Sequence, residues 1–179
     1  SRMVAVFLLA FLGVTEAFAL NEHSELPLVP DRALSLDTDE GSWISVDVSP
    51  DGTMIVFDLL GDIYTLPFSG GDARSLTTGM AYDSQPRFSP DGSQIVFVSD
   101  RDGAENLWLL DVASKVTKQL TTTMANNYES PDWLPDGEYI VAATASHERN
   151  WVDSSNPKLW MWHVRGGSGI QLIREPGSR

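Results

Sequence analysis

A short turn sequence recurs three times along this chain and constrains its fold more than any other feature. The copies are Ser49-Pro50-Asp51-Gly52, Ser89-Pro90-Asp91-Gly92 and Leu134-Pro135-Asp136-Gly137, at spacings of 40 and 45 residues. Proline fixes φ at the second position of a turn, aspartate is tolerated at the third, and glycine accepts the fourth. Such a turn joins two antiparallel strands, and a period of this length is typical of propellers and solenoids.

The segments on both sides of each turn repeat as well. A short strand precedes each turn, an apolar strand follows it, a third strand carries an aliphatic–aromatic pair, and a fourth ends at a leucine. The pairs are Ile63-Tyr64, Leu107-Trp108 and Leu159-Trp160. Four strands in about 40 residues match one blade of a β-propeller. A generic antiparallel sandwich is the alternative, and three aligned copies of all four strands disfavour it.

We therefore predict an all-β chain, an incomplete β-propeller of about three four-stranded blades at residues 43–77, 83–121 and 129–173. One orphan strand, Arg32 to Asp37, precedes them and resembles the fourth strand of a blade. A ring of six or seven blades needs roughly 240–300 residues. The sequence is therefore interpreted as a fragment of a larger protein, with residues 174–179 as a truncated linker.

The N-terminal segment has the pattern of a signal peptide. Residues 3–14 carry no charge, Arg2 precedes them, and Ala17-Phe18-Ala19 follows as a small-x-small site. Twelve apolar residues are too few to cross a bilayer, which needs about 20. We predict a signal peptide at 1–19, a linker at 20–31 and an exported product, periplasmic or secreted, with no membrane span after cleavage. A buried core segment is the alternative.

Composition excludes several classes of function. The chain has 12 Lys+Arg against 25 Asp+Glu and a formal net charge of −13, so a nucleic-acid partner is not expected. It has no cysteine, which excludes disulfides, thiolate metal sites and cysteine nucleophiles.

No motif in the sequence predicts catalysis or metal binding. The Gly166-Gly167-Ser168-Gly169 run lacks the final glycine of a serine-nucleophile elbow, and Asp100–Glu105 lacks the ligand spacing of an EF-hand. The three histidines do not form a metal-ligand spacing; they are His23, His147 and His163. We predict no catalytic residue, metal site or cofactor within this segment, and we interpret the tryptophans at repeated positions as packing between blades.

A ligand is expected on the face of the propeller that carries the longer loops. Loops between blades and loops between the second and third strands of a blade share this face, and they vary in length and charge. The candidate binding residues on them are Asp83, Arg87, Arg101, His147, Arg149 and Trp151.

The turns and strands resemble TolB-like propeller repeats, distant relatives of WD repeats, over residues 32–173. A narrower similarity, in Asp39–Trp43, Val46–Gly52 and Phe57–Tyr64, is to the N-terminal propeller of exported bacterial amidohydrolases. This resemblance implies an accessory propeller that gates or orients substrate, with a divalent metal held in a catalytic domain outside this segment. Prolyl-oligopeptidase-type peptidases and periplasmic TolB-like protein-binding modules carry similar blades and stay open as alternatives.

The resemblance also implies partners. They are further C-terminal blades and a further domain of the same protein, and a periplasmic protein or peptide-like substrate. An open ring leaves its outer flanks uncovered, so we expect the isolated segment to self-associate. The residues predicted on these flanks are Ile55, Phe57, Tyr64, Ile140, Trp160 and Trp162.

Overall fold

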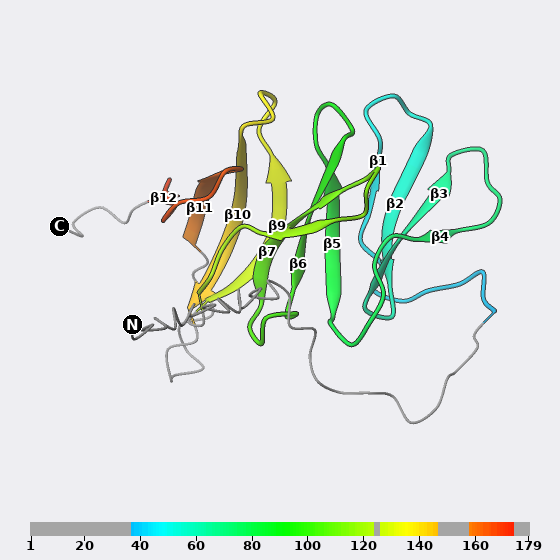
Figure 1. Ribbon diagram of the computed structural model, residues 1–179, viewed down its shortest axis with the longest axis horizontal. Coiled ribbons are helices and arrows are strands. Elements are labelled where there is room, and N and C mark those ends of the chain that lie inside the picture. Colours follow the sequence, from blue (N-terminus) through cyan, green and yellow to red (C-terminus); the bar gives the residue numbers. More distant parts are fainter. Residues whose placement is uncertain (1–36, 124–125, 147–157, 174–179) are drawn as a thin grey trace, which may run out of the picture.

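The computed structural model describes residues 37–123, 126–146 and 158–173, which form three four-stranded antiparallel sheets (Figure 1). The first holds β1 (Val46–Val48), β2 (Met54–Leu59), β3 (Asp62–Pro67) and β4 (Arg74–Ser75). The second holds β5 (Asp83–Phe88), β6 (Gln94–Ser99), β7 (Asn106–Asp111) and β8 (Thr117–Gln119). The third holds β9 (Asn126–Trp133), β10 (Tyr139–Ser146), β11 (Lys158–His163) and β12 (Ile170–Gln171).

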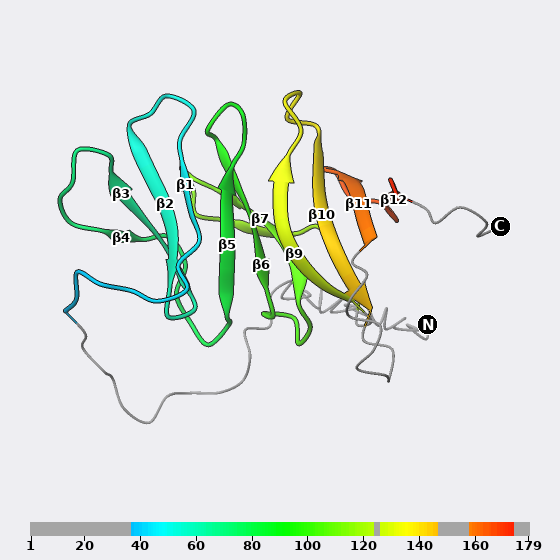
Figure 2. The same ribbon diagram turned by 180° about the vertical axis from the view of Figure 1, so that it is seen from behind.

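In each sheet the order in space follows the order along the chain, as in a propeller blade. The sheets stand face to face in a row, and β5 contacts β1 and β2 while β9 contacts β5 and β6 (Figures 1 and 2). The predicted all-β, open three-blade fold is confirmed, and we call the sheets blades 1, 2 and 3. No helix long and apolar enough to cross a membrane occurs among the described residues.

Several predicted segments lie outside the described residues. They are the signal peptide at 1–19, the linker at 20–31 and the C-terminal linker at 174–179. Only residue 37 of the predicted orphan strand is described.

The three repeated turns share one conformation. Gly52, Gly92 and Gly137 have φ of 71°, 73° and 70°, which an L-side chain rarely adopts. In blade 1 the Asp51 carboxylate accepts hydrogen bonds from Ser49 Oγ (2.6 Å) and from the backbone N–H of Thr53 (3.0 Å). These bonds, that from Ser49 first, lower the pKa of Asp51, and the same arrangement lowers the pKa of Asp91. The aspartates therefore stabilise the turns through hydrogen bonds to residues of the same turn.

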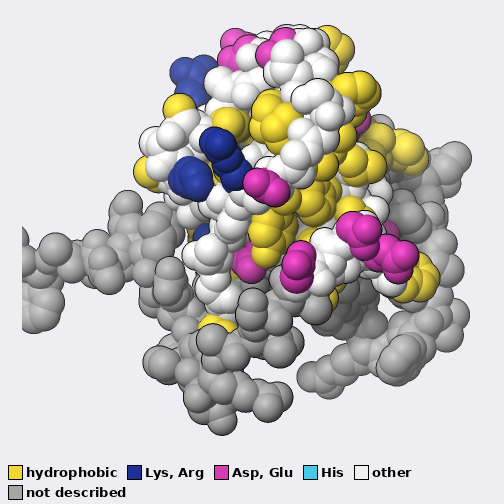
Figure 3. Space-filling model, turned by 90° about the vertical axis from the view of Figure 1, so that its right-hand side faces the viewer, with side chains coloured by type: hydrophobic (Ala, Val, Ile, Leu, Met, Phe, Trp, Pro, Cys, Tyr) yellow, Lys and Arg dark blue, Asp and Glu magenta, His cyan; other side chains and the backbone are white. Residues whose placement is uncertain are grey.

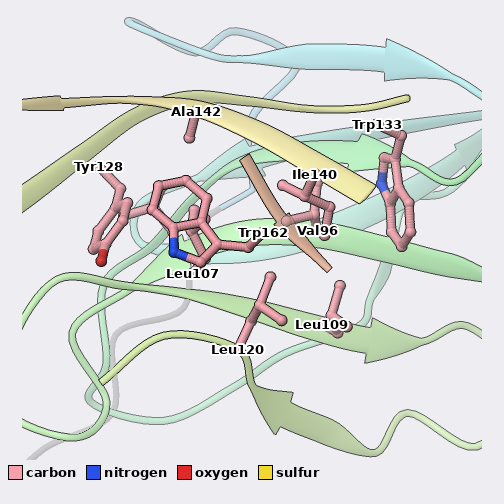
Figure 4. Close-up of a cluster of buried hydrophobic side chains, with 10 residues drawn as sticks. Val96, Leu107, Leu109, Leu120, Tyr128, Trp133, Ile140, Ala142 and Trp162 are labelled. Carbon is pink, nitrogen blue, oxygen red and sulfur yellow. The ribbon is translucent and has the colours of Figure 1, made fainter. Parts of the chain in front are cut away.

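Two hydrophobic clusters lie between the blades, because alternate side chains of each strand point to opposite faces. Between blades 1 and 2 the buried residues are Val56, Ile63, Phe88, Ile95, Phe97, Trp108 and Leu110. Between blades 2 and 3 they are Val96, Val98, Leu107, Leu109, Leu120, Tyr128, Trp133, Ile140, Ala142 and Trp162 (Figure 4). Blade 2 is thus buried on both faces, and the predicted packing of repeated tryptophans between blades is confirmed.

One prediction about the outer flanks was wrong. Ile140, Trp160 and Trp162 face blade 2, where Ile140 and Trp162 are buried and Trp160 packs against the same cluster. Neighbouring residues of a strand face opposite ways, so the outer side of blade 3 presents the residues between them. These half-buried residues are Val141, Ala143, Leu159 and Met161. On blade 1, Ile55, Phe57 and Tyr64 do lie on the outer side, half-buried, together with Leu66.

Candidate functional site

Two predicted binding residues on the loop-rich face bind each other. Arg101, in the β6–β7 loop, donates through Nη2 to both carboxylate oxygens of Asp83, at 2.8 and 2.6 Å. Asp83 begins β5 and is 1% exposed, whereas Arg101 is 19% exposed. The guanidinium carbon also lies 5.4 Å from the Phe97 ring centre and 5.2 Å from that of Trp108. This ion pair holds the β6–β7 loop down on blade 2.

A third charged side chain lies close to this pair. Asp62, the first residue of β3 in blade 1, has its pKa raised, first by burial and then by the negative charge of Asp83, while Arg101 partly offsets the rise. Two carboxylates and one guanidinium therefore share the loop-rich face where blades 1 and 2 meet. Among the described residues no group of His, Cys, Asp or Glu is arranged to hold a metal ion.

The third predicted residue, Arg87, is separate from these. It lies near the opposite end of β5, and its Nη1 donates to the carbonyls of Pro86 (2.8 Å) and Val46 (3.4 Å). Its side chain thus reaches from blade 2 to the first strand of blade 1. The remaining candidates, His147, Arg149 and Trp151, lie outside the described residues.

The sequence analysis missed an exposed apolar patch on the loop-rich face. We define the loop patch as Leu60, Met80 and Tyr82, which are 76%, 43% and 62% exposed. The two loops lie side by side, because the Asp83 N–H donates to the Gly61 carbonyl at 2.8 Å. Leu60 also has φ of 55°, in a two-residue hairpin position that favours Asn or Gly. In the sequence, the signal for this conformation of Leu60 is a leucine before a glycine at a predicted hairpin turn.

A second missed feature is a hydrogen-bond network that connects the start of β7 to the segment after β8. Asn106 is fully buried, and its Oδ1 accepts from Thr121 Oγ1 (2.9 Å) and the Thr123 N–H (3.0 Å). Thr121 Oγ1 also accepts from the Leu107 N–H at 3.0 Å, as Thr77 Oγ1 does from Ile63 in blade 1 at 2.9 Å. A repeated Leu-Thr-Thr at 76–78 and 120–122 is the sequence signal for this bond.

The opposite face holds a shallow pocket of about 320 Å³ between the turns of blades 2 and 3. Trp133 and Gln94 line it together with residues of the two turns, including Asp91 and Asp136. The Trp133 Nε1 donates to the Arg87 carbonyl at 3.1 Å, so the indole is already held in place. The sequence analysis placed no ligand here.

With the fold and site described, the chain can be compared with known proteins. Residues 32–178 match the family described as the tricorn protease N-terminal beta propeller domain. The chain belongs to this family. Its blades also have the TolB-like fold: the TolB-type protein of Agrobacterium tumefaciens superposes with a TM-score of 0.64 at 22% identity, over 75% of this chain and 50% of that protein.

Two relatives are similar in sequence. Tricorn protease homolog 1 of Streptomyces coelicolor is 30% identical over 106 residues, which are 58% of this chain and 10% of the relative. Dipeptidyl-peptidase 5 of Porphyromonas gingivalis is 29% identical over 150 residues, which are 73% of this chain and 21% of the relative. The chain therefore spans about a fifth or less of these relatives.

Proposed function

We propose that this chain is the propeller part of an exported hydrolase that acts on peptides, and that its loop-rich face guides the substrate toward a catalytic domain. The observation that carries the proposal is membership of a protease propeller family, together with similarity to a dipeptidyl-peptidase. These relatives favour a peptidase over the metal-dependent amidohydrolase implied by the sequence resemblance. Export rests on the predicted signal peptide at 1–19.

The loop patch supports a substrate-guiding role. Apolar side chains exposed on loops of a rigid sheet framework are typical of binding surfaces. Leu60 and Tyr82 are next in sequence or one residue removed from Asp62 and Asp83, and the ion pair of the buried Asp83 with the half-buried Arg101 holds the loops in place. An extended peptide would contact the apolar side chains and leave the ion pair intact.

The test measures the hydrolysis of a long and a short substrate by the complete protein that contains this chain. Tyr82→Ala should raise KM for an unfolded protein substrate such as casein several-fold, and leave hydrolysis of a dipeptide nitroanilide unchanged. Val116→Ala is the matched control, because Val116 is also 62% exposed but lies in the β7–β8 turn. Equal effects of both variants would contradict the proposal.

The second candidate is a non-enzymatic, TolB-like binding module, favoured by the superposition on a TolB-type protein. The same experiment separates the two. A complete protein that hydrolyses neither substrate, yet retains a protein partner in a Tyr82-dependent way, would establish the binding module.

A further inference from the structure

The loop patch is formed where loops of two neighbouring blades meet. Leu60 is in the β2–β3 turn of blade 1, and Met80 and Tyr82 are in the segment that joins blade 1 to blade 2. A Cβ on Gly61 would lie 3.1 Å from Tyr82 Cδ2, so the Tyr82 ring lies against the β2–β3 turn, next to Leu60. The patch therefore belongs to the junction of blades 1 and 2, and not to the outer sheet faces where further blades of the protein are expected.

The conformation of Leu60 is the first observation that indicates a ligand. Leu60 is 76% exposed and has φ of 55°, a backbone conformation that is unfavourable for leucine. Residues with such conformations are concentrated at binding sites and other functional sites, where the rest of the fold holds them in place. An exposed leucine held in this way favours contact with an apolar group of a ligand.

Acidic side chains surround the loop patch. Asp62 begins β3 directly after the β2–β3 turn. Asp100, in the β6–β7 loop, accepts a hydrogen bond from the Tyr82 N–H through Oδ1 at 2.7 Å. The same loop also carries the exposed Asp102 and Glu105. We define the acidic rim as Asp62, Asp100, Asp102 and Glu105.

The negative charge of the acidic rim is not balanced on this face. Arg101 is the only basic residue in the described loops of blades 1 and 2 on the loop-rich face, and Asp83 neutralises it. Figure 3 views the blade 1 end with the loop-rich face below; acidic side chains gather beside hydrophobic ones in its lower half, and most Lys and Arg side chains lie above them. The loop-rich face therefore combines exposed apolar groups with an excess of negative charge.

This combination discriminates between peptides by charge as well as by apolar surface. A large apolar side chain that covers Leu60 and Tyr82 gains free energy by leaving water. A lysine or arginine next to it is attracted by the acidic rim, whereas a glutamate or aspartate is repelled. The apolar stem of lysine or arginine also packs on an aromatic ring such as that of Tyr82 while its charged end reaches a carboxylate.

We infer that the loop patch and the acidic rim bind an extended peptide segment in which large apolar residues alternate with lysine or arginine. The apolar side chains cover the loop patch, and the basic side chains lie against the acidic rim. The inference rests on the proposed function, because it takes the bound segment to be part of the substrate. It adds a preference for basic segments over acidic ones.

The test measures the affinity of the complete protein for three short fluorescein-labelled peptides by fluorescence polarisation. The first peptide alternates lysine and leucine, the second has glutamate in place of lysine, and the third has alanine in place of leucine. The lysine–leucine peptide should bind several-fold more tightly than either of the others. Its advantage over the glutamate peptide should shrink as salt rises, because exposed charges are screened.

Variants assign the preference to the acidic rim. Asp100→Asn removes the charge but keeps an oxygen that accepts the Tyr82 N–H, so it should weaken binding of the lysine–leucine peptide about two- to fivefold. Asp111→Asn is the matched control, because Asp111 Oδ1 accepts the Ser114 N–H at 2.8 Å in the β7–β8 turn, away from the loop patch. Glu105→Gln is a second variant of the acidic rim, and far-ultraviolet circular dichroism checks that all variants fold.

Chromatography of the same mixtures after incubation measures hydrolysis and separates this inference from the proposed function. Equal affinities for the lysine and glutamate peptides, or for the leucine and alanine peptides, would overturn the inference even if every peptide is cleaved. Unchanged affinity in both Asp100→Asn and Glu105→Gln would overturn it as well. Selective binding that depends on the acidic rim, without any cleavage, would support the binding surface and contradict the proposed hydrolase.

Discussion

Arg101 was predicted from the sequence as a binding residue on a loop, but in the structure it stabilises the fold through an ion pair with Asp83. Its guanidinium neutralises the buried Asp83 and lies over two aromatic rings. Removing one partner of a buried ion pair leaves an uncompensated charge, so Arg101→Ala should lower the free energy of unfolding by about 3 kcal/mol. Urea unfolding measures this. The control is Lys115→Ala, because the exposed Lys115 ammonium donates to the Ser75 carbonyl and, among the described residues, forms no ion pair. Equal losses would contradict the role of the Asp83–Arg101 pair.

The raised pKa of Asp62, which lies near the same ion pair, predicts that the free energy of unfolding depends on pH. Its pKa is raised in the folded protein, so the folded state binds its proton more tightly than the unfolded state does. The ionised carboxylate therefore destabilises the fold above the folded pKa, and this penalty disappears below the ordinary value of 3.8. Asp62→Asn should stabilise the chain at pH 7 and lose this advantage as pH falls toward 3.8. Urea unfolding across this range, with exposed Asp72→Asn as control, checks the sign.

The backbone of Leu60 has an unfavourable conformation, and the exposed side chain makes no packing contact that would require it. It is 76% exposed and has φ of 55°, where a side chain such as leucine costs about 1 kcal/mol. Leu60→Asn should raise the free energy of unfolding by about 1 kcal/mol, because asparagine tolerates this conformation. If the loop patch guides substrate, the same change should weaken binding of the long substrate. Thermal melts and KM values measure the two effects separately.

At the scale of the strand and turn, the repeated Pro-Asp-Gly turns join blades as well as strands. Gly92→Ala meets both an unfavourable φ of 73° and a Pro50 contact at 3.4 Å, so it should cost more than 1 kcal/mol. Gly70→Ala, at φ of 87° with nothing within 4 Å, carries the backbone strain alone. The difference in urea midpoints between the two variants therefore measures the contact between blades. Equal midpoints would show that Pro50 moves aside at no cost.

The sequence predicted the strands and turns because both depend on local chemistry that recurs with the blade. It did not predict the bulge within β5 and β9, where Gln85 and Ser130 have φ of 56° and 51°. Their N–H groups donate to Asp58 and Gln85 of the preceding blades, at 2.7 and 2.6 Å. A proline after each of these residues, inside a strand, was the available signal.

The candidate site was less predictable than the fold. Asp83 and Arg101 were identified as charged loop residues, but only the structure shows that they neutralise each other across 18 positions of sequence. Likewise, the two-residue period of a strand predicts which side chains of β11 share a face. It does not predict which of the two faces packs against blade 2. That choice depends on how β10 and β11 pair, with Ala142 opposite Trp160.

At the scale of the whole molecule, blade 2 is the stabilising centre, because it alone among the described blades is buried on both faces. The repeat offers a matched pair to test this, since Ile55 and Ile95 occupy the same position in blades 1 and 2. Ile95 is fully buried, whereas Ile55 is half-buried on the outer side of blade 1. Ile95→Ala should cost about 3 kcal/mol, within the range for buried aliphatic truncations. Ile55→Ala should cost clearly less, because fewer side chains surround Ile55 within the described residues. Urea unfolding of the two variants measures the difference, and equal costs would mean that the outer side of blade 1 is covered from within the chain.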